Sequence, residues 1–185
     1  MWPENIFELR LDEISEDIYA ETGQDDELTR LPNESAIITL ANLLTIFFVI
    51  DLYFIDGRHN VVPITSAHLA RWHLSLEELS RIASNNATNI PIECWLQLTT
   101  NGTAYEYPNY DKNWTGLLLS PTRLTINDDD PLILVPCPDK VLLADANDRA
   151  GKREALKRAN ALSDKSLIHT LRYRSSTSKW EPYPL

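Results

Sequence analysis

The longest apolar stretch of the chain lies between residues 41 and 55 and constrains the fold more than any other segment. From Leu43 to Ile55 it is rich in β-branched and aromatic residues, which favour a strand. Alternate residues from Leu44 to Phe54 form one wholly apolar face, and the opposite face carries a single charge, at Asp51. A strand that is apolar on both faces belongs at the centre of a covered sheet.

Hairpin signals surround this stretch. The dipeptides at residues 56–57 and 101–102 are Asp-Gly and Asn-Gly, both typical of tight turns between antiparallel strands. Further strand pairs are predicted at residues 92–98 with 103–107, at residues 131–135 with 141–144 and at residues 167–173 with 179–183. Adjacent hairpins separated by helices indicate an α+β fold with a largely antiparallel sheet on which the helices pack.

Three helices are predicted from capping residues and apolar spacing. Ser75 and Glu78 form a capping box at the start of a helix, and Asn147 or Asp148 begins another that runs to about residue 162. Residues 4–22 have apolar residues at roughly helical spacing with acids between them, so we expect an N-terminal amphipathic helix. Shorter helices are expected at residues 68–72, capped by Thr65 or Ser66, and at residues 114–119.

Charge is distributed unevenly along the chain. Residues 1–34 contain eleven acidic residues against two arginines, whereas residues 149–185 contain nine basic residues against three acidic ones. Residues 24–35 are polar and contain Pro32, so we expect a boundary there. We therefore divide the chain into an acidic N-terminal helix and linker appendage at residues 1–35 and an α+β domain at residues 36–185.

The composition restricts the surroundings and partners of the protein. The first residues lack the basic and apolar regions of a secretory signal, and the apolar stretch is shorter than the roughly 20 residues that cross a bilayer, so we expect a cytoplasmic protein away from membranes. A net charge of −10 repels nucleic acid at long range. The expected partner is another protein or a second copy of the chain.

No familiar catalytic motif is present. The five glycines stand singly, which excludes a phosphate-binding loop, and neither a Cys-x-x-Cys nor a His-Glu-x-x-His motif occurs. We expect no metal and no cofactor. Asp51 is the one possible functional carboxylate because it interrupts an apolar strand, where an unpaired carboxylate is costly. Its side chain either reaches the rim of the sheet, pairs with a base such as Arg172, or serves a hydrolase site.

The candidate binding residues are aromatic, histidine or basic. Exposed tryptophans are favoured at interfaces, and basic side chains clustered near aromatic ones suit anions and single-stranded nucleic acid. One group lies in and just after the helical piece predicted at residues 68–72. The other lies in the basic C-terminal part of the chain. Together they are Trp72, His68, His73, Arg149, Lys152, Arg153 and Trp180.

Three stretches resemble a bacterial family catalogued as domain of unknown function 1444. They are residues 50–88, residues 116–156 with the segment PLILVPCPDKVLLAD, and residues 171–183 with the segment LRYRSSTSKWEPY. The resemblance covers residues 41–183. It implies an α+β fold in a bacterial cytoplasm and implies no activity, cofactor or catalytic residue.

Together these features favour a non-catalytic protein-binding module, either an adaptor or an inhibitor of the immunity type, in the bacterial cytoplasm. The acidic surface would steer association with a basic target. Two alternatives stay open. One is a hydrolase with a site near Asp51, and the weaker one is an anion or nucleic-acid binder that uses the basic C-terminal helix. Whether the chain is an enzyme is thus left open, with the balance toward no catalysis.

Overall fold

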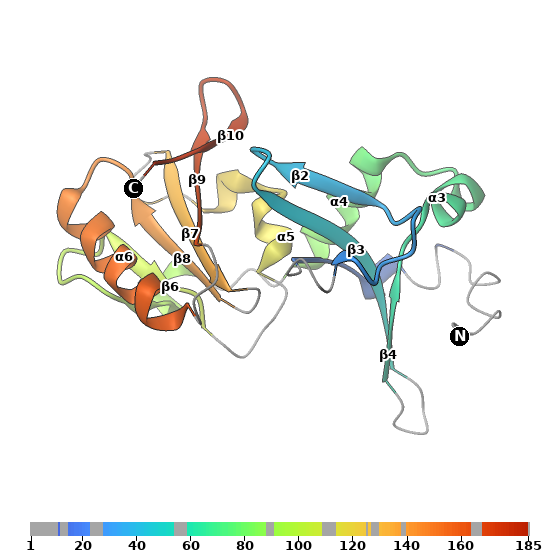
Figure 1. Cartoon of the computed structure of the whole chain (residues 1–185), viewed down its shortest axis with the longest axis horizontal. Helices are drawn as coiled ribbons and strands as arrows, with labels where there is room; N and C mark the ends of the chain where they lie inside the picture. The colour runs from blue at the N-terminus through green and yellow to red at the C-terminus, as the bar shows by residue number, and fades with distance from the viewer. Residues whose placement is uncertain are drawn as a thin grey trace.

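The fold consists of two antiparallel sheets with helices packed against them. The computed structural model describes residues 11, 15–22, 28–53, 59–87, 91–108, 114–124, 126, 130–137, 140–163 and 168–184. Figure 1 shows the two sheets at opposite ends of the molecule, with helix α5 between them. The predicted α+β class is therefore confirmed, although two sheets are present where one was expected. No helix in this part of the chain is long and apolar enough to span a bilayer.

The first sheet is built around strand β3, which coincides with the apolar stretch. The strands of this sheet are β1 Ile18–Thr22, β2 Ile37–Leu40, β3 Leu44–Tyr53 and β4 His59–Pro63. One edge of β3 pairs with β1. The other edge pairs with β2 along the first half of β3 and with β4 along its second half. Phe48 is fully buried on one face of β3 and Val49 is 1% exposed on the other. The prediction of a covered central strand is confirmed.

The prediction of a helix at residues 4–22 is wrong over its last part. Residues 15–17 form a short 3-10 turn, η2 (Ser15–Asp17), and β1 follows directly as a strand. Ile18, Ala20 and Thr22 are buried in alternation, because pairing with β3 places every second side chain in the core. Long-range pairing thus overrides the helical spacing of the sequence. Residues 4–10 and 12–14 of that prediction lie outside the described residues.

The second sheet has six strands in the order β10-β9-β7-β8-β6-β5. Their bounds are β5 Leu96–Gln97, β6 Ala104–Glu106, β7 Pro131–Cys137, β8 Lys140–Asp145, β9 His169–Arg174 and β10 Lys179–Pro182. The predicted pairs β7–β8 and β9–β10 are confirmed. The predicted strand at residues 92–98 is mostly wrong, because Ile92–Cys94 forms the 3-10 turn η3 and only two residues join the sheet.

Two of the helices begin where the capping residues predict, after Ser75 and after Asp148. Their bounds are α3 Ser66–Trp72, α4 Leu76–Asn86, α5 Thr115–Leu118 and α6 Arg149–Leu162, and a 3-10 turn η4 spans Pro121–Arg123. In the capping box of α4, the N–H of Glu78 donates to Ser75 Oγ at 3.2 Å and the N–H of Ser75 donates to Glu78 Oε2 at 2.8 Å. Two backbone donors at the helix start are thereby satisfied.

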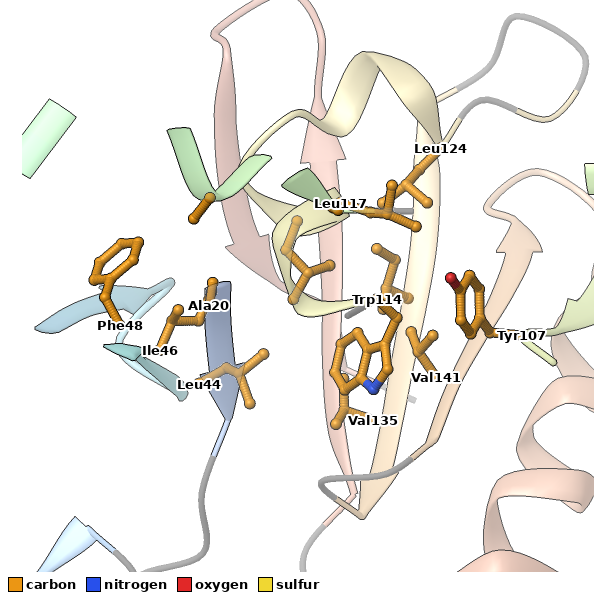
Figure 2. Packing of buried hydrophobic residues seen from close by; sticks show 14 of the residues in the cluster. Ala20, Leu44, Ile46, Phe48, Tyr107, Trp114, Leu117, Leu124, Val135 and Val141 are labelled. Carbon is orange, nitrogen blue, oxygen red and sulfur yellow. The ribbon is translucent and has the colours of Figure 1, made fainter. Parts of the chain in front are cut away.

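The main core joins the two sheets. Figure 2 shows Trp114 beside Val135 and Val141 of the second sheet, with Ile46 and Phe48 of the first sheet across the view. Trp114 is 1% exposed and belongs to the same buried cluster as Phe48 of β3. A smaller core lies on the other face of the second sheet, beneath α6. The second sheet is thus covered on both faces.

Candidate functional site

Helix α6 is held at a defined place on the second sheet by its first turn. Asp148 caps the helix: its carboxylate accepts hydrogen bonds from the N–H of Ala150 at 3.1 Å, from the N–H of Gly151 at 3.0 Å and from the Thr103 hydroxyl. A Cβ at Gly151 would lie 2.7 Å from the carbonyl oxygen of Thr103. Only glycine therefore allows this close approach of the helix to the loop that precedes β6.

An open pocket lies beside these first turns of α6. Its volume is about 950 Å³, and it is lined by two segments far apart in the sequence, the helix and the C-terminal residues: Asp148, Arg149, Ala150, Lys152, Arg153, Leu156, Tyr183 and Pro184. Residues three, four and seven positions apart share one helix face, which brings Arg149, Lys152 and Arg153 together. We call this the α6 pocket. It contains the whole basic group of the predicted binding residues.

The opposite wall of the α6 pocket is fixed by the backbone. Beyond the end of β10, the N–H of Tyr183 donates to the carbonyl oxygen of Thr170 at 3.0 Å, so the chain stays alongside β9. Lys152 Nζ donates to the Tyr183 hydroxyl at 3.2 Å and lies 5.7 Å from the centre of its ring. The tyrosine therefore holds one ammonium group at the pocket wall and leaves two guanidinium groups beside it.

The electrostatics of the α6 pocket favour an anion. Hydrogen bonds from the Thr103 hydroxyl and from the N–H groups of Gly151 and Ala150 hold the pKa of Asp148 below its usual range, so this carboxylate is ionised and engaged in capping. The Nε atom of exposed Arg153 lies 3.6 Å from partly exposed Glu154, which is a weak surface pair. Within the described part of the chain, Arg149 has no carboxylate partner. The guanidinium groups of Arg149 and Arg153 are therefore the cations available to a ligand.

A buried ion pair fixes the rest of α6 on the sheet. The Nε atom of Arg158 lies 2.6 Å from Glu106 Oε2, and Lys140 Nζ lies 3.7 Å from Glu106 Oε1. Glu106 is only 5% exposed, and its hydrogen bond raises the pKa of Arg158. Glu106 is buried whereas the Arg158 side chain is 40% exposed. Arg158 does not line the α6 pocket, and its contact with Glu106 stabilises the helix position.

The other predicted binding residues do not join this site. His68 is buried on α3, where its Nδ1 accepts the N–H of Thr65 at 3.0 Å and its ring centre lies 5.3 Å from that of Trp72. Burial and nearby Arg71 lower the pKa of His68, so it is neutral at physiological pH. His73 is exposed and ends α3 in a left-handed conformation with a φ of 54°. This group caps and packs a helix of the first sheet.

Trp180 is a structural residue of the main core. Its Nε1 donates to the carbonyl oxygen of Leu118 at 3.0 Å, and its ring centre lies 5.4 Å from that of Tyr173. The side chain packs against the face of the second sheet opposite α6. Trp180 therefore lies on the other side of the sheet from the basic residues with which the sequence grouped it.

Asp51 lies on β3, opposite Val61, and is half-buried. Of the alternatives for Asp51, pairing with Arg172 is wrong, because Arg172 belongs to the second sheet, where its Nη2 lies 3.5 Å from Asp130 Oδ2. Burial, followed by the nearby charges of Asp51 and Glu16, raises the pKa of Asp17. A carboxylate pair therefore exists here, but neither member lines the α6 pocket.

Sequence reasoning missed the two residues that turn a basic helix face into a pocket, Tyr183 and Leu156. The spacing of the basic residues could have shown their common face, but nothing local placed the C-terminal residues against it. No group of three or more His, Cys, Asp or Glu side chains in the described ranges could hold a metal ion. No family model, curated protein or solved structure matches the chain. The resemblance of residues 41–183 to a family stays a prediction.

Proposed function

We propose that this chain is a non-catalytic binding module that holds an acidic polypeptide segment in the α6 pocket. The observation that supports the proposal most directly is the convergence of Arg149, Lys152 and Arg153 on one open pocket whose other wall is Tyr183. Guanidinium groups bind carboxylates in a planar, bidentate manner, so two arginines suit glutamate or aspartate side chains. The role of adaptor or inhibitor remains part of this proposal.

The composition of the α6 pocket favours a polypeptide over a nucleic acid. Leu156, Ala150 and Pro184 supply apolar surface between the cations, which suits a peptide with mixed acidic and apolar side chains. Stacking of bases requires free aromatic rings, and here the one lining ring, Tyr183, already holds Lys152. The net charge of −10 repels a polyanion with a dense backbone charge more strongly than a short acidic segment.

Fluorescence anisotropy with a labelled glutamate-rich peptide tests this proposal. A lysine-rich peptide and a single-stranded oligonucleotide serve as comparison probes. We expect the glutamate-rich peptide to bind most tightly and its affinity to fall as salt rises. The double variant Arg149→Glu with Arg153→Glu should weaken binding about tenfold or more, since each lost charged contact is worth roughly 1 kcal/mol or more. A glutamate at position 149 also suits the first turn of a helix, so the fold should persist.

The matched control is the double variant Lys157→Glu with Lys179→Glu. It changes the net charge by the same amount on exposed residues, one on α6 and one on β10, outside the pocket lining. Its effect on peptide binding should be much smaller. Equal weakening by both double variants would show that only the overall field acts, and tighter binding of the oligonucleotide would favour the nucleic-acid alternative; either result contradicts the proposal.

A further inference from the structure

Strand β2 is an edge strand with no device that discourages further pairing. It hydrogen-bonds only with β3 among the described strands. Residues 36–50 contain no charged residue and no proline. The edge strand β10 of the second sheet, by contrast, carries Lys179, Glu181 and Pro182. Charges and proline are the usual means by which proteins prevent the addition of another strand.

Open hydrogen-bonding groups lie along this edge. The N–H of Phe48 donates to the carbonyl oxygen of Ala36, so the alternation of an antiparallel pair directs Ile38 and Leu40 toward β3 as well. The N–H and C=O groups of Ile37 and Thr39 therefore point to the open edge. Because Ile37 and Thr39 are two positions apart on the strand, their N–H and C=O groups form the pattern of donors and acceptors that one more antiparallel strand requires.

The side chains along the same hairpin are apolar and exposed. Three large hydrophobic residues are exposed in the described part of the chain, and two of them belong to the β2–β3 hairpin: Ile37 is 47% exposed and Leu43 is 37% exposed. Figure 1 shows β2 along the upper edge of the first sheet, with the β2–β3 turn directed toward the second sheet. The turn itself places Ala41 and Asn42 in the left-handed region, with φ values of 52° and 56°. The structure thus presents an uncharged, apolar strand edge to solvent.

We propose that β2 pairs with β2 of a second copy of this chain, antiparallel and about a two-fold axis at Ile38. In this register, Ile37 of each copy faces Thr39 of the other, and every open group of the two residues finds a partner. A second copy fits better than an unrelated peptide because the edge matches itself and a two-fold axis uses each contact twice. The edge also offers no charge with which to select a charged partner.

The two copies carry a net charge of −10 each, whereas the paired edges are uncharged. Salt screens repulsion between the copies and does not weaken the uncharged contact. The dimer should therefore become tighter as salt rises, which is the opposite of the salt dependence expected for the α6 pocket. The two proposals can thus fail independently.

Sedimentation velocity of the full chain, from low to high micromolar concentration and at two salt concentrations, tests the dimer. We expect a monomer–dimer equilibrium that Ile37→Lys weakens about tenfold or more, because two lysines are brought into the apolar edge. Thr39→Pro removes an outward N–H and should have a similar effect. Ile37 is half-exposed, so Ile37→Lys should keep the circular dichroism and thermal midpoint of the native chain even if Thr39→Pro does not fold.

Leu96→Lys is the matched control. Leu96 is 55% exposed on β5, the edge strand of the second sheet, so this variant makes the same change at a different edge. It should leave the dimer intact. A native chain that stays monomeric throughout, a dimer that Leu96→Lys weakens as much as Ile37→Lys does, or a dimer that dissociates at high salt would each overturn the proposal.

Discussion

The first sheet is centred on a strand with one charge in ten residues, whereas the second sheet contains ionised groups within its structure. Strand β3 is covered on both faces by apolar packing, and its neighbour β2 keeps an open edge. In the second sheet, Glu106 fixes α6 through Arg158, and Asp130 contacts Arg172. Apolar packing has no direction, but a buried ion pair requires one position of its partners. The ordered pocket accordingly belongs to the sheet with the ion pairs.

Trp114→Ala should have the largest effect, because it removes the side chain that both sheets share through the main core. Loss of a fully buried tryptophan costs about 4 kcal/mol of unfolding free energy. Urea unfolding followed by circular dichroism measures this loss, with Leu96→Ala as an exposed control. If the sheets depend on a common core, the variant unfolds in one transition at lower urea. Loss of one sheet with the other retained would show that the sheets are independent.

Glu106→Gln should come next, because it removes the negative charge between Arg158 and Lys140. Removing one partner of an ion pair, when one partner is buried and the other is partly exposed, costs about 2 to 3 kcal/mol of unfolding free energy. Glu154→Gln is the matched control, since Glu154 pairs with Lys157 at 3.4 Å on the surface of the same helix, and such pairs contribute less than about 1 kcal/mol. Urea midpoints of the two variants compare them. Equal losses would mean that the ion pair of the second sheet has no special role.

The smallest effects concern pH, and they have opposite signs in the two sheets. Hydrogen bonds from Ser175 hold the pKa of Asp130 below its ordinary value of 3.8. The contribution of Asp130 to the stability of the fold is therefore present above pH 3.8 and is lost as the pH falls through the lowered pKa. Asp17 has the opposite effect, because its pKa is raised. Its contribution to the stability of the fold is present below pH 3.8 and is lost as the pH rises through the raised pKa. Asp17→Asn should therefore stabilise the chain at neutral pH by less than about 1 kcal/mol.

Asp130→Asn is the counterpart and should destabilise the chain at neutral pH. The effect of Asp17→Asn should shrink as the pH is lowered toward about 3, where the native Asp17 carboxyl is protonated. The effect of Asp130→Asn should begin to shrink only below pH 3.8 and should vanish only once the pH has fallen through the lowered pKa of Asp130. Urea midpoints at the two pH values measure them. A stabilising effect of Asp17→Asn that persists unchanged at the acid pH would show that repulsion among Asp17, Asp51 and Glu16 is not its cause.

Local signals predicted much of the fold and part of the candidate site. The apolar period of β3, the capping box of Ser75 and the cap at Asp148 all act over a few residues, so they are readable along the chain. The spacing of Arg149, Lys152 and Arg153 is likewise a local property of one helix. The structure places Trp180 apart from these residues, because Trp180 and α6 lie on opposite faces of the second sheet.

The sequence by itself determined the class of the fold, the covered strand at its centre and the starts of α4 and α6, because each depends on neighbours within one turn or one hairpin. Only the tertiary structure decided that residues 18–22 form a strand, that two sheets are present, and that Tyr183 closes a pocket beside α6. These outcomes depend on pairing between distant segments. The free energy of such pairing comes from the whole core, so it cannot be predicted from any short stretch of the sequence.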